Sequence, residues 1–194
     1  MPIIDHFGLL APLYETFIQP KDPEELSTLI DLPTSGALLD AGGGTGRVAQ
    51  FMLEKADLVV VADLSCKMLA EASQKEGLHP VCSPTETLPF SENSFQCIIM
   101  VDALHHVIDH QRTINELWRL LAPGGTIVIE EPDVRTISVI LIAIAEKLAL
   151  MRSHFISPPR IAALFDFPDA DLDIQKNTST AYIIARKEKH ADKA

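Results

Sequence analysis

The sequence has few cysteines, and their arrangement suggests neither a metal site nor a disulfide scaffold. The three of them, Cys66, Cys82 and Cys97, are an odd number and lack the paired spacing of zinc ligands. All three lie in or beside apolar stretches, where a free thiol behaves as a small hydrophobic side chain. We therefore expect buried, inert thiols and no metal.

The chain is also short of basic residues. It carries 16 Lys and Arg against 27 Asp and Glu, a formal net charge of −11. Binding along a nucleic-acid backbone relies on clustered Lys and Arg. This composition therefore argues against nucleic acid as a partner, although glycines and carboxylates could still hold a single nucleotide.

A third absence is that of a long apolar run. The most apolar segment, residues 137–145, is far shorter than the roughly 20 residues that span a bilayer. No basic region precedes an apolar run near the start of the sequence. These absences predict a cytoplasmic protein without stable membrane insertion.

What the sequence does contain is an alternation of strand-like and helical segments over 194 residues, 47% of them hydrophobic, which suits a single domain. Strands are predicted at residues 37–40, 57–63, 80–83, 95–101 and 126–130. Helices are predicted at residues 5–19, 23–32, from about 47, 65–77 and 109–121. Because parallel strands need helix-sized crossovers, the alternation predicts a doubly wound α/β sheet.

The end of the chain departs from this alternation. Residues 171–176 and 180–186 are both strand-like, and only residues 177–179 separate them. That link is too short for a parallel crossover, so an antiparallel hairpin is predicted.

The first predicted strand leads into a glycine-rich turn, residues 40–46, with the pattern D-x-G-x-G-x-G. Its glycines permit turn conformations and remove Cβ atoms that would block a ligand. A helix expected to begin near Arg47 would add unpaired N–H groups and a positive dipole end. A P-loop would need Lys at position 47, and a dinucleotide-binding turn would need a small residue there. The turn thus indicates a nucleoside-like cofactor with an anionic group, held in neither of those ways.

Four segments in order carry a family resemblance: LLDAGGGTGRVAQ, VVVADLSCKMLAEA, ETLPFSENSFQCIIMVDALHHV and LWRLLAPGGTIVIEEPD. They resemble the class I S-adenosylmethionine-dependent methyltransferases, in particular the type 11 or UbiE-like small-molecule group. The resemblance spans about residues 37–133. It implies a Rossmann-like, seven-stranded, mostly parallel sheet with helices on both faces. It also implies S-adenosylmethionine as cofactor, S-adenosylhomocysteine as product and a small-molecule methyl acceptor.

The resemblance divides the single domain, 1–194, into four parts. Residues 1–34 would form a helical cap, 35–133 the cofactor-binding core, 134–168 a substrate-side helical insert and 169–187 the C-terminal hairpin. The cofactor-binding residues it implies are Asp40, Gly42, Gly43, Gly44, Gly46, Asp63, Leu64, Met68, Thr85, Val101 and Asp102. Among these, Asp63 would accept hydrogen bonds from both ribose hydroxyls, and Met68 could equally be ordinary core packing.

One position departs from the family pattern. Where the family has an acid that binds the adenine amino group, this sequence has Pro84, which has no side-chain acceptor and no N–H. The backbone N–H of Thr85 could still reach an adenine ring nitrogen. Glu86 could substitute for the missing acid, although its position is structural in the family. The loss of one hydrogen bond would weaken binding by about 1 kcal/mol.

Methyl transfer from a sulfonium relies mainly on proximity and alignment, and needs a base only when the acceptor holds its proton tightly. The catalytic candidates, which follow the fourth strand, are His105, His106 and Asp102; the histidines could instead merely fix the loop. On the substrate side we place Tyr14, His106 and Glu131, where packing or turn roles are the alternatives. The motifs leave the acceptor atom (O, N, S or C) open.

Residues 135–151 are apolar nearly all round, a pattern typical of a helix that is buried or paired. We interpret residues 136–150 as a lid or a homodimer face beside a small hydrophobic acceptor. A non-catalytic, dimeric S-adenosylmethionine-binding module is the alternative function, favoured by Pro84 and the lack of an obvious base. A nucleotide-dependent oxidoreductase is a more distant third, which binding of NADH would support.

The apolar 136–150 segment yields a prediction for the full chain. Either the protein sediments as a dimer, because that segment pairs with its copy, or lipophilic acceptors raise its melting temperature. A monomer that no lipophilic ligand stabilises would contradict the interpretation.

Overall fold

The computed structural model describes residues 23–32, 34–134, 154–178 and 180–189. The predicted helix at 5–19, with Tyr14, and the apolar segment at 136–150 lie outside the described residues. No helix within the described ranges has the length and apolar character needed to cross a membrane.

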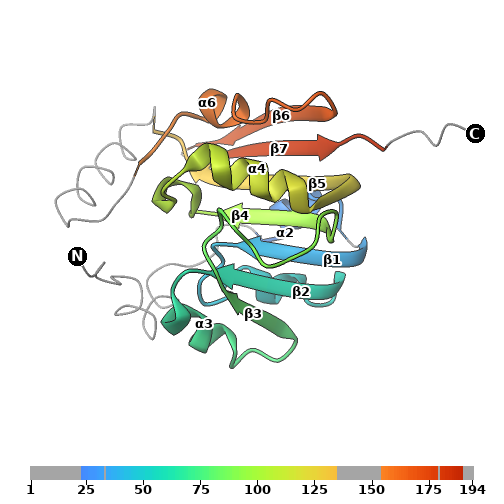
Figure 1. Ribbon diagram of the computed structural model, residues 1–194, viewed down its shortest axis with the longest axis vertical. Coiled ribbons are helices and arrows are strands. Elements are labelled where there is room, and N and C mark those ends of the chain that lie inside the picture. The colour runs from blue at the N-terminus through green and yellow to red at the C-terminus, as the bar shows by residue number, and fades with distance from the viewer. Residues whose placement is uncertain (1–22, 33, 135–153, 179, 190–194) are drawn as a thin grey trace, which may run out of the picture.

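Seven strands form one sheet in the order β3-β2-β1-β4-β5-β7-β6 (Figure 1). They are β1 (Thr34–Ala41), β2 (Ala56–Asp63), β3 (Leu78–Cys82), β4 (Phe95–Val101), β5 (Leu121–Pro132), β6 (Ala170–Asn177) and β7 (Thr180–Lys187). The first five strands are parallel. β7 runs antiparallel to both β5 and β6, which confirms the predicted C-terminal hairpin.

Helices cover both faces of the sheet, as predicted. They are α2 (Pro23–Leu29), the 3₁₀ helices η1 (Ala49–Met52) and η2 (Leu104–His106), α3 (Cys66–Ala72), α4 (His110–Leu120) and α6 (Pro158–Ala162). One hydrophobic core includes Leu117 of α4 and Ile161 of α6. The other, on the opposite face, includes Leu26 of α2, Met52 of η1 and Leu69 of α3. Figure 1 shows α4 in front of the sheet and α2 behind it.

Several predicted boundaries are wrong; α3, for example, ends at Ala72 rather than at residue 77. The chain after the glycine turn forms only the four-residue η1, rather than a helix that begins near Arg47. The Phe51 amide donates to the carbonyl of Val48, a 3₁₀ bond, while the Gln50 side chain donates to the carbonyl of Arg47. β5 begins at Leu121 rather than Thr126, because the Pro-Gly-Gly stretch joins the strand through an irregular register with β4.

The cysteine prediction is also wrong for two of the three residues. Cys66 and Cys82 are exposed and form a disulfide, with their Cα atoms 5.7 Å apart. Parallel pairing sets Cys82 opposite Asp63, and Cys66 follows Asp63 by three residues, so the two side chains meet at the strand ends. Cys97 is a buried free thiol as expected. Burial raises its pKa to about 12, so it stays protonated.

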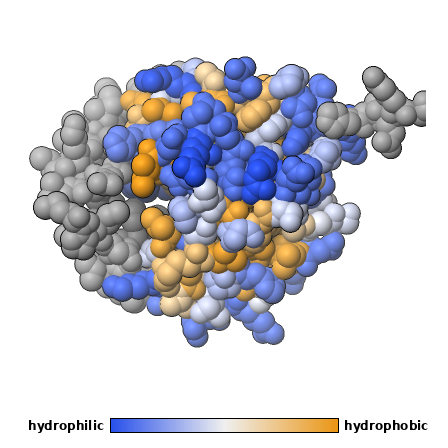
Figure 2. Space-filling model, viewed as in Figure 1, coloured by the Kyte–Doolittle hydropathy of each residue, from blue (hydrophilic) through white to orange (hydrophobic). Residues whose placement is uncertain are grey.

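The two sides of the front face differ in character. Hydrophilic side chains cover the outer side of α4, whereas apolar side chains gather below it, toward β1 and β2 (Figure 2). The connection from β3 to β4 is a loop rather than a helix, and its Leu88 and Phe90 pack on the core below α4. A loop therefore borders the edge of the sheet where β1, β2 and β3 end.

Lys187 fastens the end of β7 to the end of α4. Its ammonium donates to the carbonyls of Leu121 (2.9 Å) and Trp118 (3.1 Å), and lies 5.4 Å from the centroid of the Trp118 ring. A cation at this place satisfies the last carbonyls of the helix.

We predict that Lys187→Met lowers the free energy of unfolding by about 1–3 kcal/mol, because helix-end carbonyls lose a charged donor. Urea denaturation measures the change. The matched control is Lys176→Met on the exposed face of β6, which should stay within about 0.5 kcal/mol of the parent. Equal effects of the two substitutions would contradict the assigned role.

Candidate functional site

The glycine turn lies at the carboxyl end of β1, at the point where the strand order reverses. β2 and β3 extend to one side of β1, whereas β4 and β5 extend to the other. Ligands of open α/β sheets bind in the crevice outside such a switch point. The topology therefore places the sequence-predicted glycine turn at the expected binding edge.

Close packing explains why this turn consists of glycines. A Cβ added to Gly42, whose φ is +74°, would meet the Ala103 Cβ at 2.7 Å. A Cβ on Gly44, at φ +55°, would meet the Met68 Cε at 3.0 Å. The turn thus fits between the loop that follows β4 and helix α3, and its bare backbone forms a cradle that side chains would fill.

Asp40 lies buried beneath this cradle. A Cβ added to Gly43 would come within 2.5 Å of the Asp40 carboxyl group, and neither carboxyl oxygen has a hydrogen-bond partner among the described residues. Burial raises the pKa of Asp40 to about 7, and the charge of Asp63 adds to the rise, whereas the charge of Arg47 and the backbone N–H of Ala49 oppose it. A buried carboxyl without a partner is costly. It is a feature that a cationic or hydrogen-donating ligand would satisfy.

Asp63, at the end of β2, connects the turn to helix α3. One carboxylate oxygen accepts the backbone N–H of Gly44 at 2.9 Å, and the other accepts that of Ser65 at 2.7 Å. Ser65 caps α3 through its own hydroxyl, as predicted. Each carboxylate oxygen can accept more than one hydrogen bond. Asp63 can therefore hold the turn and still face two ligand hydroxyls.

Arg47 is a residue that the sequence reasoning missed as a site residue. Its guanidinium lies 3.2 Å from the carboxylate of Asp102, and the side chains are 7% and 23% exposed. Asp102 takes a left-handed backbone conformation, φ +50°, just after β4. Such strain in a residue other than glycine is found preferentially at functional sites. The signal in the sequence was a basic residue directly after the glycine turn.

His105 and Glu131 form a buried pair. The His105 Nδ1 lies 2.6 Å from a Glu131 carboxylate oxygen, and both side chains are 5% exposed or less. The other Glu131 oxygen accepts the backbone N–H of Leu104 at 2.7 Å. Phe155 stacks on the His105 ring at 4.2 Å, and His106 packs against the same ring at 3.9 Å. Glu131 thus fixes both the ring orientation and the loop that carries it.

Residues predicted for the adenine side flank the β2 and β3 ends. Leu64 is 64% exposed, although it is a large apolar residue directly after Asp63. Met68 is buried against the glycine turn, and Thr85 is buried near Thr113 of α4. Glu86 accepts the backbone N–H groups of residues 108 and 109, which agrees with a structural role.

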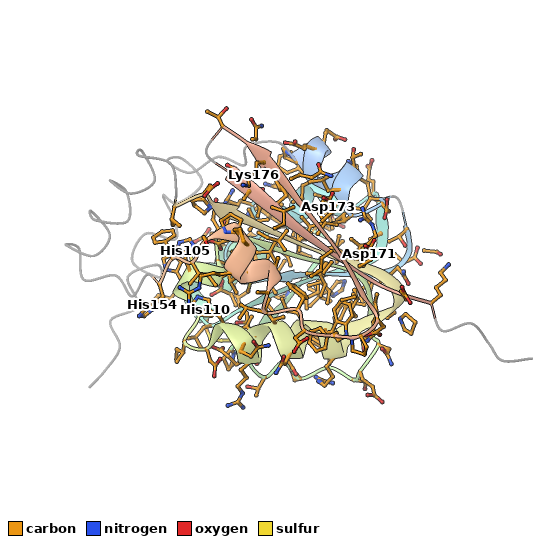
Figure 3. All side chains as sticks on the ribbon, turned by 90° about the horizontal axis from the view of Figure 1, so that it is seen from above. His105, His110, His154, Asp171, Asp173 and Lys176 are labelled. Atoms are coloured by element: carbon orange, nitrogen blue, oxygen red, sulfur yellow. A yellow bond between two sulfur atoms is a disulfide. The ribbon has the colours of Figure 1, made fainter. Side chains whose placement is uncertain are left out.

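Four histidines lie at one end of the molecule, counting His106, whose ring packs against that of His105. Figure 3 shows His105 near His110, at the start of α4, and near His154, whereas Asp171, Asp173 and Lys176 lie apart along β6. The His154 amide donates to the His105 carbonyl at 2.6 Å. Within the described ranges, no group of three or more His, Cys, Asp or Glu side chains could hold a metal ion.

Comparisons with known proteins match the part of the chain that contains the glycine turn. Residues 39–129, from β1 to β5, match a family model described as a methyltransferase domain. This match confirms the resemblance to class I S-adenosylmethionine-dependent methyltransferases. The methyltransferase family implies S-adenosylmethionine as the cofactor.

Two curated methyltransferases illustrate the similarity. The demethylmenaquinone methyltransferase of Corynebacterium urealyticum is 29% identical over 102 residues, which cover 53% of this chain and 44% of the relative. The UbiE C-methyltransferase of ubiquinone and menaquinone biosynthesis from Legionella pneumophila is 31% identical over 105 residues, 49% of this chain and 42% of the relative. The matched region thus spans less than half the length of either relative.

A solved structure shows the fold. The putative methyltransferase of Haloferax volcanii, in complex with the Trm112 activator, superposes with a TM-score of 0.77 and 15% identity. The superposition covers 96% of this chain and 99% of that one.

We predict that stability depends on pH through Asp40. Its pKa is about 7 in the folded chain against 3.8 for the ordinary side chain, so the folded state holds a proton that the unfolded state has lost. The free energy of unfolding should therefore fall as pH rises from about 4 to about 7. At about 1.4 kcal/mol per pH unit, this group accounts for about 4 kcal/mol across that window.

The matched variant is Asp40→Asn, which keeps the shape but carries no charge. Urea denaturation at pH 5 and pH 8 should show that the free energy of unfolding of the variant, relative to that of the parent, is higher at pH 8 than at pH 5. An equal difference between the two proteins at both pH values would contradict the raised pKa.

Proposed function

We propose that this chain transfers the methyl group of S-adenosylmethionine to a small, hydrophobic acceptor by in-line displacement. The observation that carries the proposal is the arrangement around Asp63. Its carboxylate lies at the end of β2 and accepts the amide of Gly44 in the glycine turn. This arrangement puts an acceptor-only group beside a bare backbone cradle, which suits a ribose with two hydroxyl donors.

The charges around the turn suit the amino-acid end of the cofactor. A methionine moiety carries an ammonium and a carboxylate, and the site offers the carboxyl groups of Asp40 and Asp102 and the cation of Arg47, which lies 3.2 Å from Asp102. The ammonium would satisfy the buried Asp40 carboxyl and favour its ionised form. Arg47 would meet the carboxylate, with Asp102 keeping the guanidinium in place.

S-adenosylmethionine supplies a methyl group on a sulfonium, and the thioether that leaves is neutral. The protein therefore has to align the acceptor and exclude water rather than protonate a leaving group. Val101 ends β4 and Asp102 follows it next to the glycine turn, where the two residues would lie between cofactor and acceptor. Aligning these groups is the main contribution that we assign to the chain.

His105 is the base in this proposal. With Glu131 accepting the Nδ1–H, the Nε2 atom becomes the basic nitrogen of the neutral ring, and it can take a proton from an acceptor hydroxyl, amine or thiol. The Glu131 carboxylate would stabilise the resulting imidazolium. His106, which packs against His105 and is less buried, is assigned to acceptor contact.

The class of acceptor is inferred from the names of the relatives and from one apolar segment of the sequence. The two curated relatives act, by their names, on demethylmenaquinone and in ubiquinone and menaquinone biosynthesis. The apolar 136–150 segment is in keeping with a lipophilic acceptor. Four expectations stay predictions: Tyr14 as an acceptor contact, a homodimer through residues 136–150, the domain boundaries and a cytoplasmic location.

Calorimetry with S-adenosylhomocysteine tests the cofactor site. We expect the full chain to bind with a micromolar dissociation constant. The Asp63→Ala substitution should weaken binding by about 10- to 100-fold, because hydrogen bonds to a charged group are lost. The matched control is Asp171→Ala, an exposed acid on β6 far from the turn, which should bind like the parent.

Two outcomes would count against the proposal. If the parent chain shows no binding, the cofactor assignment is wrong. If it binds the cofactor but methylates no member of a broad panel of small acceptors, the non-catalytic binding module is the better account. A thermal melt of the Asp63→Ala variant separates lost binding from lost folding.

A further inference from the structure

We propose that Cys66 and Cys82 are a reversible redox pair whose disulfide closes the adenosine side of the cofactor site. This inference rests on the proposed function, since it concerns binding at the same site. The bond joins two segments that come from different strands and flank the expected ribose and adenine positions. Its effect would be to set cofactor affinity by the redox state of the protein.

The position of the pair within the fold is the first argument. Cys66 is the first residue of α3, and it follows directly on Asp63, Leu64 and Ser65. Cys82 is the last residue of β3, opposite Asp63 in the strand register. The disulfide therefore crosslinks the segment of the ribose-binding acid to the segment that continues into residues 83–85 of the adenine loop.

The second argument is how few other bonds hold the start of that loop. Its far end is anchored, because Glu86 accepts two backbone N–H groups before α4 and the Leu88 amide donates to Glu116 of α4 at 2.8 Å. At its near end, the Ser83 amide donates to the Asp63 carbonyl at 3.0 Å. The disulfide adds a covalent link at that same near end. Without it, residues 83–85 depend on that backbone bond, on the Ser83 hydroxyl donating to the Thr87 carbonyl at 2.8 Å and on the contact of Thr85 with Thr113 of α4 at 3.5 Å.

Pro84 makes the position of the loop more important. This residue has neither a side-chain acceptor nor an N–H, so the chain here recognises adenine through backbone position and apolar contact. A loop held in its bound position before the ligand arrives loses less conformational entropy on binding. The disulfide would supply that preorganisation in place of the missing side-chain contact.

The pair is accessible to reagents, and the third thiol is not. Both Cys66 and Cys82 are exposed, and exposed disulfides are the ones that thiol exchange reaches. Cys97 lies in the core with 3% of its surface exposed, and its raised pKa of about 12 keeps it protonated. Cys97 therefore does not compete in exchange.

The redox step is a thiol–disulfide exchange with a dithiol. One thiolate of the dithiol attacks a sulfur of the Cys66–Cys82 bond, forming a mixed disulfide and releasing the other cysteine. The second thiol of the reagent then displaces the remaining cysteine. Two electrons and two protons pass to the protein, and the dithiol becomes a disulfide.

The test is calorimetry of the full chain with S-adenosylhomocysteine, before and after reduction with dithiothreitol. We expect the reduced chain to bind about tenfold more weakly, and reoxidation to restore the affinity. A thiol assay in denaturant should find one free thiol before reduction and three after it. Chemical reduction of the parent chain requires no variant, so the test does not depend on a substitution that folds.

The paired variant Cys66→Ser/Cys82→Ser serves as the control. It should bind as weakly as the reduced parent, and dithiothreitol should not change its affinity. A thermal melt without ligand shows whether the reduced parent is still folded at the temperature of the titration.

Three outcomes would overturn the inference. Equal affinities of the oxidised and reduced parent would do so while leaving the proposed function intact. Three free thiols in the parent under oxidising conditions would show that the pair does not form. Absence of binding in both redox states would overturn the proposed function and this inference together.

Discussion

The carboxylate of Asp63 is the contact on which the proposed cofactor site depends. Its two oxygens accept the amides of Gly44 and Ser65, so one side chain at the end of β2 fixes both the glycine turn after β1 and the start of α3. Hydrogen bonds to an ionised acceptor are among the stronger ones in proteins. The distance between the turn and the helix is therefore set before any ligand arrives.

The charges near Asp63 indicate a site that is incomplete without its ligand. Asp40 is buried with no hydrogen-bond partner in the described part of the chain, and the Asp63 charge helps to hold its pKa high. Arg47 and Asp102 form an ion pair with a contact at 3.2 Å. An unsatisfied buried acid lowers the stability of the folded chain, whereas it strengthens the binding of a cationic ligand. The cost to stability is of the kind that functional sites carry.

Much of the fold could be predicted from local pattern. Apolar runs located the strands because parallel strands buried on both faces consist almost entirely of such residues. The three-residue link at 177–179 fixed the antiparallel hairpin because no crossover fits in it. The predicted helix after the glycine turn was wrong because propensity does not show that this segment would form only the short 3₁₀ helix η1 (Ala49–Met52).

The local structure of the candidate site was predictable where one segment carries the signal, as in the glycine turn and Asp63, whose ligand contacts stay predictions. It was not predictable where two distant segments meet. The Cys66–Cys82 bond arises from the register of β2 against β3, which no local pattern encodes. The pairing of His105 with Glu131, 26 residues apart, arises in the same way. Arg47 was visible in the sequence, but its partner Asp102 is 55 residues away and meets it only because β1 and β4 are neighbours in the sheet.

The most direct test of this account is a crystal structure of the full chain with S-adenosylhomocysteine. The account predicts both ribose hydroxyls on the carboxylate of Asp63. It also predicts the amino-acid end over the glycine turn, with its ammonium toward Asp40 and its carboxylate toward Arg47. A ligand bound away from the carboxyl ends of β1, β2 and β4, or ribose hydroxyls that make no contact with Asp63, would contradict it.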